Sequence, residues 1–242
     1  MSALLEVRGA SKSFRGLKAV NNASFAVPQG KIIGLIGPNG AGKTTMFNLV
    51  AGVFAPDAGT IHFDGKLLGG LRPDQVCKVG IGRTFQIVKP FPQLSVLDNV
   101  IVGALNSQPS VPAARTRARE VLTQLRLEGK AEHLAASLTL PERKRLEVAR
   151  ALATGPKLLL LDEVMAGLRP TEVDDMVGVF RRLNAETGLT ILLIEHVMRA
   201  VMALAEHVVV LNYGEKICEG TPAEVVRDPK VLECYLGEEV EV

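Results

Sequence analysis

Four stretches of the chain consist almost entirely of apolar residues and are bounded by Gly, Pro or Asp. They lie at residues 32–36, 158–161, 189–194 and 208–211. Apolar runs of this length, without polar residues at alternate positions, are typical of strands buried on both faces, as in a parallel sheet covered by helices. We therefore predict a parallel sheet in the centre of the molecule.

Segments in which apolar residues recur at helical spacing lie between these runs. The spacing predicts helices at residues 44–51, 141–153, 171–185 and 197–205. Alternation of buried strands with helices is the pattern of an α/β fold.

One part of the chain, residues 89–155, has helical patterns but no convincing strand. Its helical segments lie at 96–104, 113–125 and 146–152, with a weak linker at 106–112. We predict one domain over residues 1–242, in which a helical subdomain of about 89–155 is inserted into an α/β core of about 1–88 and 156–242.

Composition narrows the class of protein. The 242 residues are 47% hydrophobic and 22% charged, which excludes a disordered chain. Aromatic residues make up 4%, there is no Trp, and the net charge is only +2. Because nucleic-acid binding relies on basic surfaces and stacking aromatic rings, we expect no nucleic-acid partner.

The cysteines and the hydropathy indicate a location. Cys77, Cys218 and Cys234 are far apart in the sequence, so neither a disulfide framework nor a zinc site is indicated, and a reducing cytoplasm fits best. The N-terminus lacks a secretory pattern, and no apolar run approaches the ~20 residues that span a bilayer. We expect a chain that does not itself enter the membrane.

The segment Gly37-Pro-Asn-Gly-Ala-Gly-Lys-Thr44 fits the pattern G-x-x-x-x-G-K-[ST], directly after one predicted strand and before a predicted helix. Its glycines allow backbone N–H groups to surround a polyphosphate at the positive end of the helix. Lys43 would contact the β- and γ-phosphates, and the Thr44 hydroxyl would bind Mg²⁺. The predicted nucleoside triphosphate site comprises Gly37, Pro38, Asn39, Gly40, Ala41, Gly42, Lys43, Thr44 and Thr45.

Two acidic residues, Asp162 and Glu163, end the apolar run at 158–161. A carboxylate at the carboxyl end of a buried strand is costly unless it meets a cation, so Asp162 is a candidate Mg²⁺ ligand. Glu163 points elsewhere and is a candidate to accept a proton from an attacking water. Alone, such a pair is equally compatible with a helix N-cap.

The order of these and other motifs resembles the ATP-binding subunit of an ABC transporter over essentially the whole chain. The matching segments are Walker A (37–44), Gln86 in Arg83-Thr-Phe-Gln86 (Q-loop), residues 138–142 and the following helix (signature), Asp162-Glu163 (Walker B), Ala166-Gly-Leu-Arg169 (D-loop) and His196 (H-loop).

The resemblance implies a P-loop NTPase fold with a small N-terminal antiparallel β part, and ATP with Mg²⁺ as ligands. It implies that Gln86 senses Mg²⁺, the attacking water and the membrane subunit, and that His196 holds the γ-phosphate. Phe14 would stack on adenine with Val20 beside it. The implied catalytic residues are Glu163, His196, Gln86 and Lys43, and the implied metal ligands are Thr44, Gln86 and Asp162.

Within this superfamily, three segments resemble the Liv-type subunits of branched-chain amino-acid importers, although subunits for other small solutes look similar. The segments are 14–19, 166–172 and 228–237. This resemblance implies a second ABC ATPase as partner in a homo- or heterodimer, integral membrane permeases, and indirectly a solute-binding protein. It places the chain peripherally on the cytoplasmic face of the inner membrane. Residues 88–100 resemble the stretch that docks on the permease, or form a Pro-rich turn that enters a helix.

The signature departs from the family pattern Leu-Ser-Gly-Gly-Gln, since this chain has Leu138-Thr-Leu-Pro-Glu142. Thr139 keeps a hydroxyl for the ATP bound on the opposing subunit, but Pro141 has no N–H to donate. Thr139 and Glu142 are predicted to form a capping box, with Pro141 in the first helical turn. The Glu142 carboxylate would repel a phosphate, and the basic residues 143–145 either compensate for it or form a solvated face.

Two hypotheses follow for the function. In the first, the chain is an ATPase that powers solute transport, probed by whether Glu163→Gln binds ATP without turnover. In the second, it is a nucleotide-binding subunit with a degenerate signature that acts mainly as a structural or regulatory partner of a second ATPase. An ABC ATPase of DNA repair or translation is disfavoured, because the chain has one cassette and no basic excess. The altered signature favours a pair of different ATPases.

Overall fold

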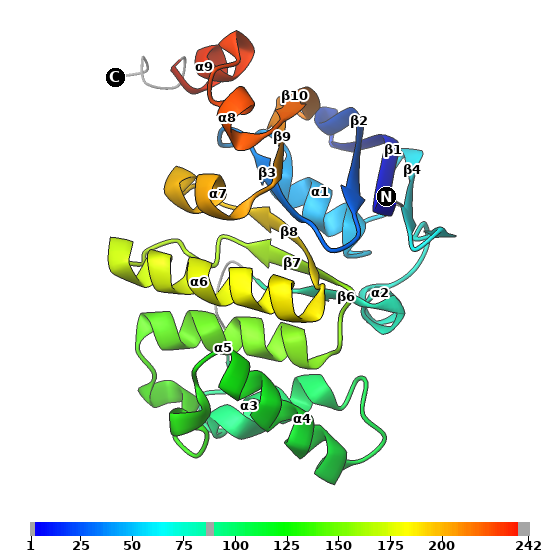
Figure 1. Ribbon diagram of the computed structural model, residues 1–242. Helices are drawn as coiled ribbons and strands as arrows, with labels where there is room; N and C mark the ends of the chain where they lie inside the picture. The colour runs from blue at the N-terminus through cyan, green and yellow to red at the C-terminus, as the bar shows by residue number, and fades with distance from the viewer. Residues whose placement is uncertain (1–2, 86–89, 237–242) are drawn as a thin grey trace.

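The computed structural model describes residues 3–85 and 90–236 (Figure 1). Within these residues the central sheet has six strands in the order β10-β9-β3-β8-β7-β6, which are parallel except for β10. The strands are β3 (Ile32–Ile36), β6 (Ile81–Arg83), β7 (Leu158–Asp162), β8 (Thr190–Ile194), β9 (His207–Asn212) and β10 (Glu215–Gly220). Every residue of β3, β7 and β8 is buried, which confirms the prediction of a parallel sheet covered on both faces.

A second, antiparallel sheet is formed near the N-terminus, in the order β2-β1-β4-β5. Its strands are β1 (Ala3–Phe14), β2 (Leu17–Pro28), β4 (Ala58–Phe63) and β5 (Lys66–Leu67). Helix α1 (Lys43–Val50) lies between the two sheets, where Phe47 packs with Phe25 of β2 and Leu35 of β3. The α/β fold with a small antiparallel β part is therefore confirmed.

Helices cover the other face of the central sheet (Figure 1). Leu158 and Leu160 face the side of α1, whereas Leu159 and Leu161 pack in the cluster that contains Phe180. The helices beyond α1 are α2 (Pro73–Val79), α3 (Val96–Ala104), α4 (Val111–Gln124), α5 (Leu140–Ala153), α6 (Pro170–Thr187), α7 (Met198–Leu204), α8 (Pro222–Val225), α9 (Pro229–Leu236) and the short 3₁₀ helices η1 (Glu128–Lys130) and η2 (Ala135–Ser137).

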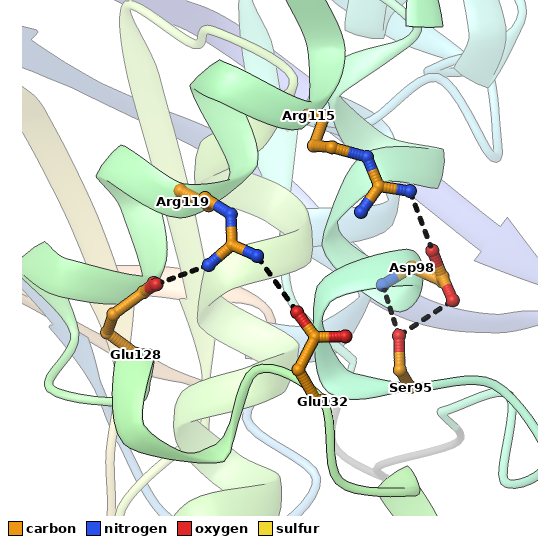
Figure 2. Close-up of polar contacts among 6 residues, drawn as sticks. All are labelled: Ser95, Asp98, Arg115, Arg119, Glu128 and Glu132. Atoms are coloured by element: carbon orange, nitrogen blue, oxygen red, sulfur yellow. Dashed lines mark hydrogen bonds and ion pairs between the residues drawn. The ribbon is translucent and has the colours of Figure 1, made fainter. Parts of the chain in front are cut away.

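Ion pairs on the outer side of α4 join it to neighbouring segments (Figure 2). Arg119 donates to Glu128 at 2.6 Å and to Glu132 at 2.8 Å, and Arg115 lies 3.9 Å from Asp98 of α3. These side chains are largely exposed, and exposed pairs contribute at most about 1 kcal/mol each. The packing of α3, α4 and α5 therefore rests mainly on their shared apolar core.

The predicted linker at 106–112 is partly wrong, because α4 begins at Val111 and includes Pro112. Proline is favoured in the first turn of a helix, where its missing N–H costs nothing, and Ser110 caps this end. The division into about 1–88, 89–155 and 156–242 stays a prediction. Among the described residues, no helix is long and apolar enough to cross a membrane.

Candidate functional site

The loop between β3 and α1 is shaped by glycines that other residues could not replace. Gly37, Gly40 and Gly42 have φ of 149°, 75° and 97°. A Cβ on Gly37 would lie 2.0 Å from the carbonyl oxygen of Leu211, and one on Gly42 would lie 2.2 Å from that of Ala19. The backbone therefore takes a course that is open to glycine and closed to residues with a side chain.

Helix α1 starts directly at the end of this loop, with Gly42 as its N-cap. Within the described chain, no side chain caps this end and its first turn holds no acidic residue. Lys43 is buried, and its Nζ donates to the carbonyl oxygens of Gly37 at 2.6 Å and Pro38 at 2.7 Å. A fixed ammonium and a positive helix end thus face the same loop, where Asn39, Gly40 and Thr44 are exposed. This arrangement suits a polyphosphate anion.

Asp162, at the end of β7, carries a buried carboxylate that is only partly satisfied. Its Oδ2 accepts a hydrogen bond from Arg83 at 3.0 Å, and its N–H donates to the Thr84 hydroxyl. Among the described residues, Oδ1 has no hydrogen-bond partner. Burial raises the pKa of Asp162, and Arg83 opposes that rise. A buried carboxylate oxygen without a partner, together with the Thr44 hydroxyl, is an oxygen donor set that fits Mg²⁺.

Glu163 and His196 lie side by side although the sequence separates them by 33 positions. Glu163 Oε1 is 2.9 Å from His196 Nε2, and 13% of the Glu163 side chain and 43% of the His196 side chain are exposed. Glu163 has φ of 50°, a conformation that is unusual for a residue with a side chain. Its N–H donates to the carbonyl oxygen of Ile194 at 2.9 Å. A nearly buried carboxylate oriented by an imidazole at an open edge is suited to accept a proton.

The predicted adenine contacts differ in exposure. Phe14 is 38% exposed and packs edge-on against Phe54, with ring centres 5.1 Å apart. Val20 is fully buried, so of these two side chains only Phe14 is accessible from solvent, and the Lys12 ammonium lies over its ring, 5.8 Å from the ring centre. Gln86 lies outside the described residues.

The altered signature forms the start of α5, as its capping pattern predicts. The N–H and the hydroxyl of Thr139 each donate to Glu142 Oε2 at 2.9 Å, and Pro141 lies in the first turn. The Thr139 N–H is the main cause of the lowered pKa of Glu142. The carboxylate therefore stays charged while it turns back onto its own helix end.

For Lys144 and Arg145, neither of the predicted alternatives holds. Lys144 is only 6% exposed, and its Nζ donates to the carbonyl oxygen of Glu163 at 3.0 Å. Arg145 pairs with Asp175 of α6. Among residues 3–85 and 90–236, the cation that pairs with Glu142 is Lys130, whose Nζ lies 3.7 Å from Glu142 Oε1. The reason is that α5 turns this part of its surface towards the end of β7 and towards α6.

The sequence reasoning also missed Glu195, next to His196. Its side chain is 2% exposed, and its Oε1 accepts a hydrogen bond from the Met165 N–H at 2.9 Å. Burial raises the pKa of Glu195 to about 7. A signal was present in the sequence, because Glu195 directly follows the apolar run of β8 as Asp162 directly follows the apolar run 158–161 of β7.

Comparison with known proteins gives consistent matches. The family described as "ABC transporter" matches residues 20–166, and the family described as "Branched-chain amino acid ATP-binding cassette transporter" matches residues 215–241. The high-affinity branched-chain amino acid transport ATP-binding protein BraF of Pseudomonas aeruginosa is 38% identical over 97% of this chain and 98% of its own length. The lipopolysaccharide export system ATP-binding protein LptB of Escherichia coli is 37% identical over 98% of both chains.

Solved structures agree with these matches. The ADP conformation of an ATP-binding cassette of an ABC transporter has a TM-score of 0.89 at 31% identity, over 98% of this chain and 100% of the other. A dimeric cassette in a post-hydrolysis state, bound to ADP and Pi, has a TM-score of 0.81 at 26% identity, over 90% and 98%. This chain therefore belongs to the ATP-binding proteins of ABC transporters, within the branched-chain amino acid (Liv-type) family, and is an ATPase coupled to transport.

Proposed function

We propose that this chain binds Mg²⁺ with ATP and powers the import of branched-chain amino acids or related small polar solutes. The observation that carries the proposal is the meeting of three features at one edge of the central sheet. They are the uncapped start of α1 with Lys43, the partly satisfied carboxylate of Asp162, and the paired Glu163 and His196.

In the proposed mechanism, Lys43 and the N–H groups of the Walker A loop hold the phosphates. Thr44, Asp162 and Gln86 would hold Mg²⁺, which would neutralise negative charge on the phosphate oxygens. Glu163 accepts the proton of the attacking water, while His196 fixes the carboxylate through the 2.9 Å contact and reaches the γ-phosphate. Phe14 stacks on the adenine, with Val20 supporting it from the core.

We propose a second ATPase as partner, with the start of α5 facing the ATP held by that subunit. The dimeric relative supports such a pairing. Thr139 retains a hydroxyl, but Pro141 offers no N–H and Glu142 adds a negative charge. A partner with a different signature would balance this loss, so we favour a heterodimer.

A permease is the proposed membrane partner, and a groove near α3 supports its docking. A cavity of about 270 Å³ is lined by Val76, Phe85, Val102 and Arg150, and two of these, Phe85 and Val102, expose about half of their surface at 58% and 46%. Such an apolar groove suits a short helix of a membrane subunit. Docking there would place the chain peripherally on the cytoplasmic face of the inner membrane, with a solute-binding protein acting through the permease.

The solute class rests on the C-terminal match. BraF and LptB are almost equally similar to this chain, although their names assign them to amino-acid transport and to lipopolysaccharide export. The match of residues 215–241 to the branched-chain amino acid family supports the first. Import of such amino acids is therefore the proposal.

The second candidate, a structural or regulatory subunit, is favoured by Pro141 and Glu142 in the signature. The two candidates differ in one measurable property. An ATPase subunit hydrolyses ATP when purified alone or as a homodimer, whereas a regulatory subunit binds ATP and hydrolyses it only through its partner.

The test is capture of the tagged full chain from gently solubilised membranes with ATP present, followed by mass spectrometry. Lys43→Ala serves as the matched control, because it should capture fewer partners that depend on bound ATP. We expect multi-span permeases and a second ATPase.

Reconstituted in liposomes, the captured complex should hydrolyse ATP faster with its solute-binding protein and leucine, isoleucine or valine. Capture of soluble partners alone, under conditions that preserve a known transporter, would overturn the proposal.

A further inference from the structure

Lys144 is a buried cation whose position suggests a role that the proposed mechanism does not use. It lies on α5, the helix that begins at the altered signature, yet its Nζ reaches the carbonyl oxygen of Glu163 at 3.0 Å. Lys144 is only 6% exposed, and burying its charge is costly unless its partners hold it there. The contact therefore joins α5 to the residue that we propose as the proton acceptor.

The backbone of Glu163 needs such support, because its φ of 50° is strained for a residue with a Cβ. Its N–H donates to Ile194, and its carbonyl oxygen accepts from the Lys144 Nζ at 3.0 Å and from the local Ala166 N–H at 3.3 Å. Two positions further, the Met165 N–H donates to the buried carboxylate of Glu195. Of the contacts that come from other elements, two come from the end of β8, and the contact of Lys144 comes from α5.

The charge of Lys144 also acts on the carboxylates around it. Burial raises the pKa of Glu195, Asp162 and Glu147, and in each case Lys144 opposes that rise. Replacement of Lys144 would therefore affect both the backbone of Glu163 and the charge balance behind it.

We propose that Lys144 is a positioning residue that holds Glu163 in its left-handed conformation and makes the placement of the carboxylate depend on the position of α5. This inference rests on the proposed role of Glu163 as proton acceptor. Because Thr139 is the N-cap of α5 and Lys144 lies five residues further along the same helix, a shift of the signature end would move Nζ relative to the Glu163 carbonyl oxygen. A change at the opposing ATP site would thereby alter the position of the Glu163 backbone without any contact to the Glu163 side chain.

The first experiment separates catalysis from binding in the complex captured through the tagged chain. Lys144→Met, which keeps length and apolar stem but removes the donor, should lower kcat about tenfold, since small displacements of a catalytic group have effects of this size. ATP affinity should stay within about twofold of the wild type, because the Walker A loop is unchanged. Lys144→Arg, which still donates, should recover most of the rate.

Lys157→Met is the matched control, because it removes an exposed lysine outside the site. The Nζ of Lys157 lies 2.6 Å from Asp64 Oδ2. The kcat of Lys157→Met should equal that of the wild type. A wild-type kcat in Lys144→Met, or a loss confined to KM, would overturn the inference.

A double-mutant cycle with Glu163→Gln tests whether Lys144 acts through Glu163. In the Glu163→Gln background, the residual single-turnover rate should be unchanged by Lys144→Met, because a residue that acts through another loses its effect when that residue is already disabled. A tenfold loss in both backgrounds would show an independent role and would overturn the inference.

Amide hydrogen exchange keeps the inference testable without any hydrolysis. In the isolated full chain, a peptide spanning residues 160–168 should exchange at least about fivefold faster in Lys144→Met than in the wild type or Lys157→Met, because one of its tertiary contacts is gone. Equal exchange would overturn the inference even if the complex hydrolyses ATP. If the wild-type complex hydrolyses no ATP while exchange changes as expected, the proposed function fails and the positioning contact stands.

Discussion

The starts of α1 and α5, the two helix ends of the candidate site, differ in whether the chain itself places a negative charge there. α1 follows Gly42, and in the described chain it has no side-chain cap and no acidic residue in its first turn. α5 follows Thr139, whose N–H and hydroxyl donate to the carboxylate of Glu142. A helix N-terminus attracts negative charge in either case. At α1 that charge must come from outside, whereas at α5 the chain supplies it.

This difference indicates that a helix end is a binding site only while its N–H groups and positive end are not already satisfied. By this criterion we expect the chain to have a competent ATP site of its own and to offer a weaker half-site to the proposed partner. The asymmetry is the physical basis for favouring a heterodimer, and substitutions at each helix end test it.

The largest effect is expected from Glu163→Gln, on the α1 side. An amide of the same shape can keep the contact with His196 but cannot accept a proton, so hydrolysis should fall about 1,000-fold while ATP remains bound. Phosphate release and nucleotide binding, measured on the same preparation, check this. Undiminished hydrolysis would show that another group accepts the proton.

Lys43→Ala should weaken ATP binding by the isolated chain about 100-fold, because it removes the cation that is fixed over the Walker A loop. Glu142→Ala is the paired variant at α5. It should leave that affinity unchanged, since α5 would serve the ATP of the opposing subunit. Fluorescent-nucleotide titration measures both, and equal losses in the two variants would contradict the separation of the two ends.

Two carboxylates also differ in their pKa. The pKa of Glu142, at the start of α5, is lowered by the Thr139 N–H, and the pKa of Glu195, directly after β8, is raised by burial to about 7. The ordinary value is 4.5, so the folded protein binds the Glu195 proton more tightly than the unfolded chain. Stability should therefore fall as the pH rises from about 4.5 to about 7. Glu195→Gln should not show this pH-dependent loss of stability. The difference in free energy of unfolding between Glu195→Gln and the wild type should therefore shift by roughly 2 kcal/mol in favour of the variant between pH 5 and pH 8, as measured by urea denaturation. A constant difference would contradict the pKa.

The sequence predicted the strands whose burial is simplest to recognise. β3, β7, β8 and β9 are apolar runs because both of their faces are covered. β1 and β2 escaped prediction from the residue pattern because they are long, half-exposed and irregular, with several register shifts along their pairing that break the alternation of apolar and polar residues. The resemblance to a known family, and not the pattern, pointed to this antiparallel part.

The candidate site likewise contains residues that short sequence motifs identify and residues that only the folding of the chain brings together. Walker A is a run of consecutive residues whose chemistry can be interpreted from the sequence, and together with it the pair Asp162-Glu163 becomes interpretable as well. Lys144 could not be recognised, since its role depends on the packing of α5 against the end of β7. The same holds for Arg83, which reaches Asp162 only because β6 pairs with β7.

The smallest expected effect concerns the charge at the start of α5. Glu142→Gln keeps an oxygen for the Thr139 N–H but removes a negative charge that, in the proposed dimer, faces the ATP of the opposing subunit. ATP-dependent dimerisation should rise, but only about two- to fivefold, because the carboxylate already turns back onto Thr139 and lies 3.7 Å from Lys130. Analytical ultracentrifugation with Glu163→Gln as the common background, so that ATP persists, measures the dimer fraction. Glu120→Gln, which removes an exposed charge paired with Arg117 on α4, is the control and should leave it unchanged. An unchanged or reduced dimer fraction in Glu142→Gln would mean that the closed cap, and not its charge, limits the contact with the opposing ATP.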